Sequence, residues 1–385
     1  MFAIRAARLF DGVSLVPRPV VLVRDGVIVS VGSAPPSDAA IVDLAERGGD
    51  VTLLPGLVDG HVHLVLDASD DPVRRLAGSS DEQLLEGARA AAQRALAAGI
   101  TTIRDLGDRG YVALRLRESA SGALPEILAA GPPLTTPRGH CWFLGGEASG
   151  VSGVRAAVRA RVERGVDVIK TMATGGEITP GTKPYESQYG LPELRAIVSE
   201  AHRAGLPATA HAHSAAGIAD ACAAGFDSIE HATFLTPTGA ESDPVVLAAL
   251  VRAGTVVSAT LGWLPGEPLS PRVAALEPVL DATFRRTYES GVKLIVTSDC
   301  GINPTKPHDV LPYGAEIFLR TGAAPIEALR AVTSAAADAC RVGHRKGRVA
   351  RGYDADLLAV RGNPLSDLAA LRNVDAVYRA GVRVR

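Results

Sequence analysis

Short apolar runs alternate with longer amphipathic stretches from about residue 53 to residue 333. The runs are rich in β-branched residues and predict strands at 53–64, 101–105, 126–130, 167–174, 207–213, 228–234, 255–261 and 293–299. The Ala/Leu/Arg-rich stretches between them predict helices near 81–98, 111–120, 151–164, 192–204, 214–224, 242–253 and 276–290. Several of these stretches end in glycine, as at Gly225 and Gly254, which is the residue preferred just beyond a helix C-terminus.

Eight successive strand–helix units are typical of a parallel (β/α)8 barrel of the TIM type. The alternative is an open, doubly wound sheet. No glycine-rich dinucleotide-binding turn follows the first predicted strand, so the barrel is favoured. We expect the barrel domain to span residues 53–345.

The two ends of the chain have a different pattern, without helical repeats. Near the N-terminus, Arg24, Asp25 and Gly26 separate two β-prone runs, which predicts a hairpin. Residues 356–360 and 376–378 are β-prone runs near the C-terminus. We therefore expect residues 1–52 and 346–385 to form one small β-sandwich domain beside the barrel.

Composition narrows the class of protein. Hydrophobic residues make up 47% and charged residues 21% of the chain, and the net charge of −2 predicts neither a nucleic-acid partner nor an anionic membrane surface. Four widely separated cysteines without a C-x-x-C motif indicate neither a zinc finger nor a disulfide framework. With no long uncharged apolar run or apolar leader, a cytoplasmic protein without a membrane partner is expected.

The first predicted barrel strand ends in two histidines, His61 and His63. Residues two apart on a strand point to the same face, so both imidazoles can bind one metal ion. Active residues of such barrels come from the C-terminal ends of strands. The other predicted strands of this barrel carry further candidates at their ends: Lys170, His211, His213, His231 and Asp299.

Each candidate also has a structural interpretation when it is considered alone. A single strand-end histidine such as His231 is often only hydrogen-bonded, Lys170 can extend to solvent along an apolar surface, and Asp299 can cap a turn. Their joint occurrence on five strands of one barrel favours a metal site. We interpret Arg104 and Asp105 as a charged pair or loop tether, and His308 as a surface residue.

The chain resembles the metal-dependent amidohydrolase superfamily over almost its whole length. The resemblance rests on P-G-L-V-D-G-H-V-H-L at the first strand, G-I-T-T-I-R-D-L-G at 99–107, D-V-I-K at 167–170, H-A-H-S-A-A-G-I at 211–218, A-G-F-D-S-I-E-H at 224–231, T-S-D-C-G at 297–301 and G-R-V-A-R-G-Y-D-A-D-L at 347–357. The subgroup it resembles comprises imidazolonepropionase-like Xaa-Pro dipeptidases (prolidases) and ochratoxin-type amidases.

The resemblance implies a binuclear centre. His61, His63 and Asp299 would bind the more buried metal ion, and His211 and His231 the second. Lys170, carboxylated on its amine, would bridge both ions. Nitrogen and oxygen ligands fit Zn²⁺ best, with Mn²⁺ or Co²⁺ as alternatives.

The resemblance also implies hydrolysis of amide or peptide C–N bonds by a metal-bridging hydroxide. Asp299 would move the proton and His213 would contact the scissile carbonyl. The expected substrate is a small molecule, an Xaa-Pro dipeptide or an N-acyl amino acid, with His140 and Tyr189 as substrate-binding residues. Homo-oligomers are common in this family and are expected here.

Three alternatives remain open. A one-metal deaminase or an imidazolonepropionase-like cyclic-amide hydrolase typically carries a Glu shortly after the strand-5 histidine, whereas residues 212–215 contain none. A lactone or carbamate hydrolase would use the same hydroxide. A non-catalytic scaffold usually loses ligands, and this chain keeps all six.

Overall fold

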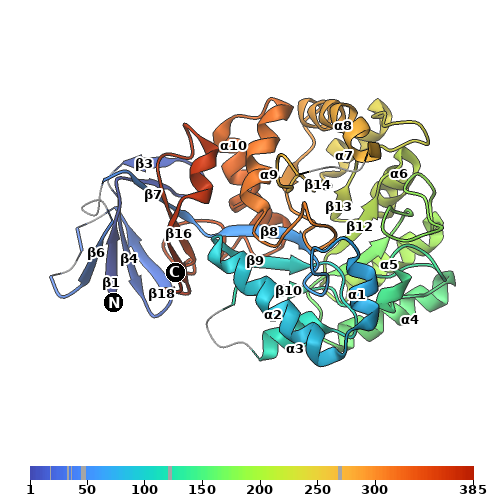
Figure 1. The fold of residues 1–385 in the computed structure, drawn as a ribbon, viewed down its shortest axis with the longest axis horizontal. Coiled ribbons are helices and arrows are strands. Elements are labelled where there is room, and N and C mark those ends of the chain that lie inside the picture. The colour runs from blue at the N-terminus through green and yellow to red at the C-terminus, as the bar shows by residue number, and fades with distance from the viewer. Residues whose placement is uncertain (18, 33, 36, 45–48, 120–123, 268–270) are drawn as a thin grey trace.

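The computed structural model describes residues 1–385 except 18, 33, 36, 45–48, 120–123 and 268–270. Strands and helices alternate through the central part of the chain, while both ends of the chain are mainly strands (Figure 1). Within the part that is described, every helix is too short or too polar to traverse a lipid bilayer.

The chain ends build two sheets that lie together, apart from most of the helices (Figure 1). A four-stranded sheet has the order β5 (Val27–Val31), β4 (Val20–Arg24), β1 (Phe2–Arg5), β6 (Ala40–Asp43). A six-stranded sheet has the order β18 (Val382–Arg383), β17 (Val374–Arg379), β16 (Leu357–Arg361), β7 (Val51–Pro55), β2 (Arg8–Phe10), β3 (Leu15–Pro17). One cluster of buried side chains, including Ile4, Val23, Leu53 and Leu357, joins them. The expected pairing of both chain ends is therefore present.

Eight parallel strands carry the rest of the fold. A three-stranded sheet has the order β10 (Glu126–Ala129), β9 (Ile100–Asp105), β8 (Leu57–Val62). A five-stranded sheet has the order β11 (Ile169–Met172), β12 (Ala208–Ala212), β13 (Ser228–His231), β14 (Val256–Ala259), β15 (Leu294–Val296). Isolated parallel bridges link the two sheets, from Leu134 to Thr171 on one side and from Val62 to Cys300 on the other. This is an α/β arrangement of the TIM-barrel type.

Most of the helices lie between successive parallel strands, as the alternating pattern predicts, and others follow the last parallel strand, β15. They are α1 (Pro72–Gly78), α2 (Asp81–Ala97), α3 (Val112–Glu118), α4 (Gly150–Glu163), α5 (Leu191–Arg203), α6 (Ala215–Ala224), α7 (Pro244–Ala253), α8 (Pro271–Glu289), α9 (Leu311–Phe318), α10 (Pro325–Ala331) and α11 (Ser334–Ala339), with short 3-10 turns η1 (Trp142–Leu144), η2 (Leu319–Thr321) and η3 (Leu368–Arg372). Gly225 and Gly254 terminate α6 and α7 in left-handed conformation, so the predicted C-cap glycines are confirmed.

The predicted first strand, 53–64, is in fact two strands. β7 belongs to the six-stranded terminal sheet, and β8 begins at Leu57 in the parallel sheet. The break falls at Gly56, where a Cβ atom would lie 2.1 Å from Thr101 Oγ1. Pro55 and Gly56 mark the break in the sequence, but the apolar residues on both sides do not reveal the change of sheet, because both strands are fully buried.

Candidate metal centre

The predicted ligands meet at the carboxyl end of the parallel strands. His61 lies on β8, Lys170 on β11 and His211 on β12, while His231 is the last residue of β13 and Asp299 follows β15. All five are buried. Their strands are neighbours within the two parallel sheets, which brings residues distant in sequence to one site.

One group of possible metal ligands consists of His61, His63 and Asp299. Their ligand atoms lie within 4.8 Å of one another, and the Nε2 atoms of both histidines are each 3.3 Å from Asp299 Oδ1. Burial raises the pKa of Asp299, but the neighbouring His61 and His63 outweigh this and hold it well below the usual range. Asp299 is therefore a carboxylate.

The hydrogen bonds of the first group leave a place for a cation. His61 Nδ1 lies 2.9 Å from Glu230 Oε2, and burial, with Lys170 nearby, lowers the pKa of His61 to about 4. A neutral His61 that donates from Nδ1 to the Glu230 carboxylate presents the Nε2 lone pair to Asp299. A lone pair and a carboxylate oxygen repel each other unless a cation lies between them, so these residues fit a metal ion.

The second group consists of His211, His213 and His231, again with ligand atoms within 4.8 Å of one another. His211 Nε2 lies 2.9 Å from the carbonyl oxygen of Gly175, so Nε2 carries the hydrogen and Nδ1 keeps its lone pair. Burial and the neighbouring histidines hold the pKa values of His211 and His231 well below 6.5. Neutral imidazoles are the form that binds metals.

The two groups adjoin each other. The ring centroids of His61 and His231 are 5.2 Å apart, and those of His211 and His231 are 4.6 Å apart. His213 is the member that the sequence assigned to the substrate rather than to a metal ion. Its Nδ1 is 2.7 Å from Thr233 Oγ1, and its ring stacks on His231 with centroids 4.6 Å apart.

Lys170 lies at this site with an unsatisfied amine. Only 1% of the residue is exposed, and its Nζ has no hydrogen-bond partner among the described residues. Burial lowers its pKa to about 8. It interacts electrostatically with His61 of the first group and His231 of the second. An uncompensated ammonium is costly to bury, so this position suits a neutral or modified amine.

Glu230 is a site residue to which the sequence analysis gave no role. It is fully buried, accepts from His61 through Oε2, and pairs with Arg104 through Oε1 at 3.1 Å. Arg104 Nε also donates to the Gly60 carbonyl at 2.7 Å, so Arg104 pairs with Glu230, while Asp105 accepts from the backbone of the neighbouring loops. The signal for Glu230 was present in the sequence as a carboxylate directly before the candidate ligand His231 in a short buried strand. A carboxylate behind a ligand histidine fixes its tautomer and orientation.

Backbone geometry also distinguishes this site. His231 and Asp299 have positive φ values of 71° and 55°, a region that non-glycine residues seldom occupy and that is common at functional sites. Gly176 lies against His140, and a Cβ atom there would be 2.3 Å from the His140 ring. Any larger residue at position 176 would displace that ring.

The histidines and Asp299 face a cavity of about 600 Å³. Its wall continues over the loops after the strands and onto α8, through Trp263, Leu280 and Phe284. The volume suits a small molecule with one apolar side. The loop after β15 contributes residues 302–306 to this wall.

The two predicted substrate-binding residues have different positions. His140 lines the cavity, is 4% exposed, and its ring centroid lies 4.7 Å from that of His211. Tyr189 is buried in the hydrophobic core, and its hydroxyl donates to the Ala148 carbonyl at 2.8 Å. The structure does not place Tyr189 among the described lining residues. Its hydroxyl orders the loop that precedes α4 instead.

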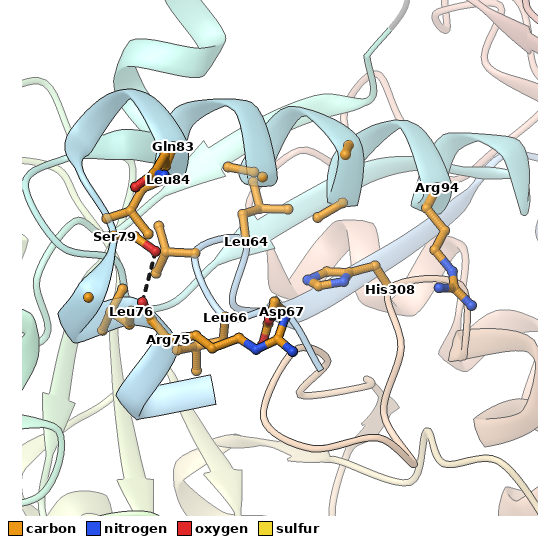
Figure 2. A pocket seen from close by; sticks show the side chains of 16 residues that line it. Leu64, Leu66, Asp67, Arg75, Leu76, Ser79, Gln83, Leu84, Arg94 and His308 are labelled. Carbon is orange, nitrogen blue, oxygen red and sulfur yellow. Dashed lines mark hydrogen bonds and ion pairs between the residues drawn. The ribbon is translucent and has the colours of Figure 1, made fainter. Parts of the chain in front are cut away.

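A second cavity, of about 650 Å³, lies against α2 (Figure 2). The His308 ring points into it, and its Nε2 lies 3.1 Å from the carbonyl oxygen of His63. The prediction that His308 is a surface residue is wrong, since it is 6% exposed. His308 supports the backbone of a candidate ligand from behind.

The comparisons with known proteins agree with this site. A family model described as "Amidohydrolase family" matches residues 52–384, which is most of the chain. The chain belongs to the amidohydrolase family. It is therefore a hydrolase, and the family is typically metal-dependent, which agrees with the two candidate ligand groups.

Particular relatives of this amidohydrolase cover nearly the same length. It is 30% identical to ochratoxinase of Aspergillus niger in an alignment of 366 residues that covers 84% of this chain and 73% of that protein. It is 28% identical to imidazolonepropionase of Salinispora tropica, with 94% and 88% covered. A Xaa-Pro dipeptidase, solved with methionine bound in its active site, superposes with a TM-score of 0.87 at 29% identity and covers 99% of each chain.

Proposed function

We propose that this amidohydrolase hydrolyses the C–N bond of a small amide or dipeptide, using two metal ions. The observation that carries the proposal is Lys170, a buried amine without a hydrogen-bond partner among the described residues, in electrostatic range of both ligand groups. The similarity to a Xaa-Pro dipeptidase and to ochratoxinase supports a dipeptide or N-acyl amino acid as substrate.

The architecture that goes with this proposal has two domains. Residues 53–345 form a closed (β/α)8 barrel, supported by the bridges that link the three-stranded and five-stranded sheets on both sides. Residues 1–52 and 346–385 form a β-sandwich, supported by the shared buried cluster. β7, which pairs with β16, extends this second unit to residue 55.

The residues present suit two divalent ions. His61, His63 and Asp299 would hold one ion and His211 and His231 the other, with Lys170 between them. Zn²⁺ is the expected metal, because the donors are nitrogen and oxygen. Divalent ions at such a site lower the pKa of a bound water and polarise a carbonyl group.

Carboxylation of Lys170 follows from its surroundings. With a pKa lowered to about 8, about a tenth of the amine is neutral near pH 7 and can attack carbon dioxide, losing a proton as the N–C bond forms. The resulting carbamate is an anionic oxygen donor, and it removes the uncompensated ammonium from the interior. We infer that Lys170 acts in this form.

The catalytic roles fall to Asp299 and His213. Asp299 is ionised and lies at the ligand cluster, so it accepts the proton of the attacking water and returns it to the leaving amine. His213 holds Thr233 with Nδ1, and its Nε2 is available to the oxygen of the scissile carbonyl. His140 lines the same cavity and orients the substrate.

Replacement of Asp299 by Asn tests the mechanism. We expect a loss of about 10³-fold in kcat, because the variant keeps an oxygen ligand but cannot accept the proton. The measurements are kcat on a dipeptide panel and the bound metal per chain. Asp67→Asn, outside the cavity, is the matched control and keeps full activity. An Asp299→Asn enzyme that keeps both metals and near-normal kcat contradicts the assigned role.

A further inference from the structure

The wall of the metal-site cavity is unusually acidic. Besides Asp299, five carboxylate residues line it, and no arginine is among the described lining residues. They are Asp70, Glu177, Glu267, Glu277 and Asp281. Water-filled clefts lined by charges of one sign concentrate ligands of the opposite sign.

The two lysines of the lining do not offset these carboxylates. Lys170 belongs to the ligand cluster. Lys306 Nζ donates to the carbonyl oxygens of Thr260 and Ser298 at 3.0 and 2.6 Å, so it is held at the cavity floor beside Asp299. A substrate carboxylate further out in the cavity meets no arginine fork of the kind that usually binds one.

The carboxylates on α8 are only partly compensated. Glu277 and Asp281 are one helical turn apart and, among the described side chains, share one cation, Arg320 of η2, at 2.7 and 3.4 Å. Two carboxylates against one guanidinium leave one negative charge. In the described part of the chain, neither Asp70 nor Glu267 is paired with a cation.

Two further features indicate that a ligand occupies this space. The Nδ1 atom of His140 is buried without a hydrogen-bond partner among the described residues, on the cavity wall. Leu276, Leu280 and Phe284 line the cavity from the same helix as Glu277 and Asp281. An apolar row beside a row of carboxylates on one helix suits an alkyl chain that ends in a cation.

We propose that the substrate carries a positive charge, an ammonium or guanidinium on an alkyl side chain, which binds beside Glu277 and Asp281. The proposal rests on the proposed amide hydrolysis and names the substrate class. It favours dipeptides that contain lysine or arginine over neutral or acidic ones.

Matched dipeptides test the charge preference. Ala-Lys, Ala-norleucine and Ala-Glu share one backbone and differ in the charge at the end of the side chain, and the reversed dipeptides place the same residues before the scissile bond. With metal-loaded enzyme we expect kcat/KM for the preferred lysine dipeptide to exceed that of its norleucine analogue about tenfold, and the glutamate analogue to be poorest.

Two variants shift the preference in opposite directions. Glu277→Gln removes a carboxylate and should lower the lysine-to-norleucine ratio about threefold. Arg320→Gln removes the competing cation and should raise the same ratio about threefold. Glu289→Gln, at the exposed end of the same helix, leaves the ratio unchanged. A purely structural role for these residues does not produce opposite shifts.

Binding of free L-lysine and L-norleucine, followed by calorimetry, separates this proposal from the proposed function. Hydrolysis without preference for lysine, or with preference for glutamate, overturns the charge assignment. Tighter binding of lysine than norleucine with no hydrolysis of any dipeptide supports the cation site and contradicts the dipeptidase proposal. Equal binding of both amino acids without hydrolysis overturns both.

Discussion

Two lysines are almost completely buried in this amidohydrolase, and their surroundings are opposite. Lys346 is 2% exposed, and its Nζ lies 3.0 Å from Glu126, 2.8 Å from Asp354 and 2.5 Å from Asp356. Lys170 is 1% exposed and has no hydrogen-bond partner among the described residues. Burial of a charge is tolerated where the charge is paired. Its ion pairs therefore account for the burial of Lys346, whereas the burial of Lys170 has no such explanation.

The paired lysine connects two parts of the fold. Glu126 begins β10 of the parallel sheet, while Asp356 precedes β16 of the terminal sheet. Arg379 of β17 also contacts both carboxylates. The carboxylates around Lys346 therefore compensate its buried charge and hold the two sheets together. A lysine that faces a ligand cluster without a partner is available for chemistry.

The sharpest test of this contrast is Lys170→Ala. We expect kcat/KM to fall about 10³-fold and bound metal to decrease, because the bridging oxygen donor is lost. Stability should not fall in proportion, since the removed amine had no partner. The measurements are kinetics, metal content and urea unfolding of the same sample. Activity within tenfold of the parent enzyme refutes a bridging role.

Lys346→Met should have the reverse profile. Its removal takes one cation from Glu126, Asp354 and Asp356, which keep Arg345 and Arg379, so we expect a loss of about 2 kcal/mol in the free energy of unfolding. Below the unfolding transition, kcat/KM should stay near that of the parent. Urea unfolding followed by circular dichroism measures the loss. A large fall in kcat/KM without destabilisation contradicts the division of roles.

Lowering the pH should reduce the free energy of unfolding through the ion pairs around Lys346. Burial raises the pKa of Glu126, but Arg345 and Lys346 outweigh it and lower that pKa from 4.5 to about 2. A depressed folded-state pKa gives stability that is complete above the unfolded value and is lost as pH falls from about 4.5 towards 2. The loss should reach about 3 kcal/mol.

The control for this pH dependence is Glu126→Gln, whose side chain does not titrate. The difference in unfolding free energy between the two proteins should shrink as pH falls from 5 to 3. A difference that is constant over this range excludes Glu126 as the source.

Much of the fold was predictable because its pattern is local. Apolar runs and capping glycines give the order of strands and helices, and strand ends give the ligand positions. Pro55 and Gly56 mark the position of the break in the sequence, but the change of sheet was not predictable, because the buried strands on both sides are apolar in the same way. Which strand joins which sheet depends on partners that lie far away in the sequence.

The site was predictable to the extent that its residues have unusual chemistry. Histidine pairs at strand ends and a lone Lys170 stand out, and the family resemblance assigned their roles. Glu230 and His308 act by supporting His61 and His63, and a supporting hydrogen bond leaves no spacing pattern. Tyr189 was misleading because a loop tyrosine can turn inward to the core as readily as outward to a substrate.

The pairing of β7 with β16 has a consequence for how the chain folds while it is being synthesised. Residues 51–55 pair with residues 357–361, and β8, which carries His61, follows β7 after one glycine. During synthesis the candidate ligand His61 on β8 therefore emerges long before β16, the strand that pairs with the neighbouring β7. β7 can pair with β2 as soon as it is made, but its other edge stays open until all the parallel strands have been synthesised and β16 follows them.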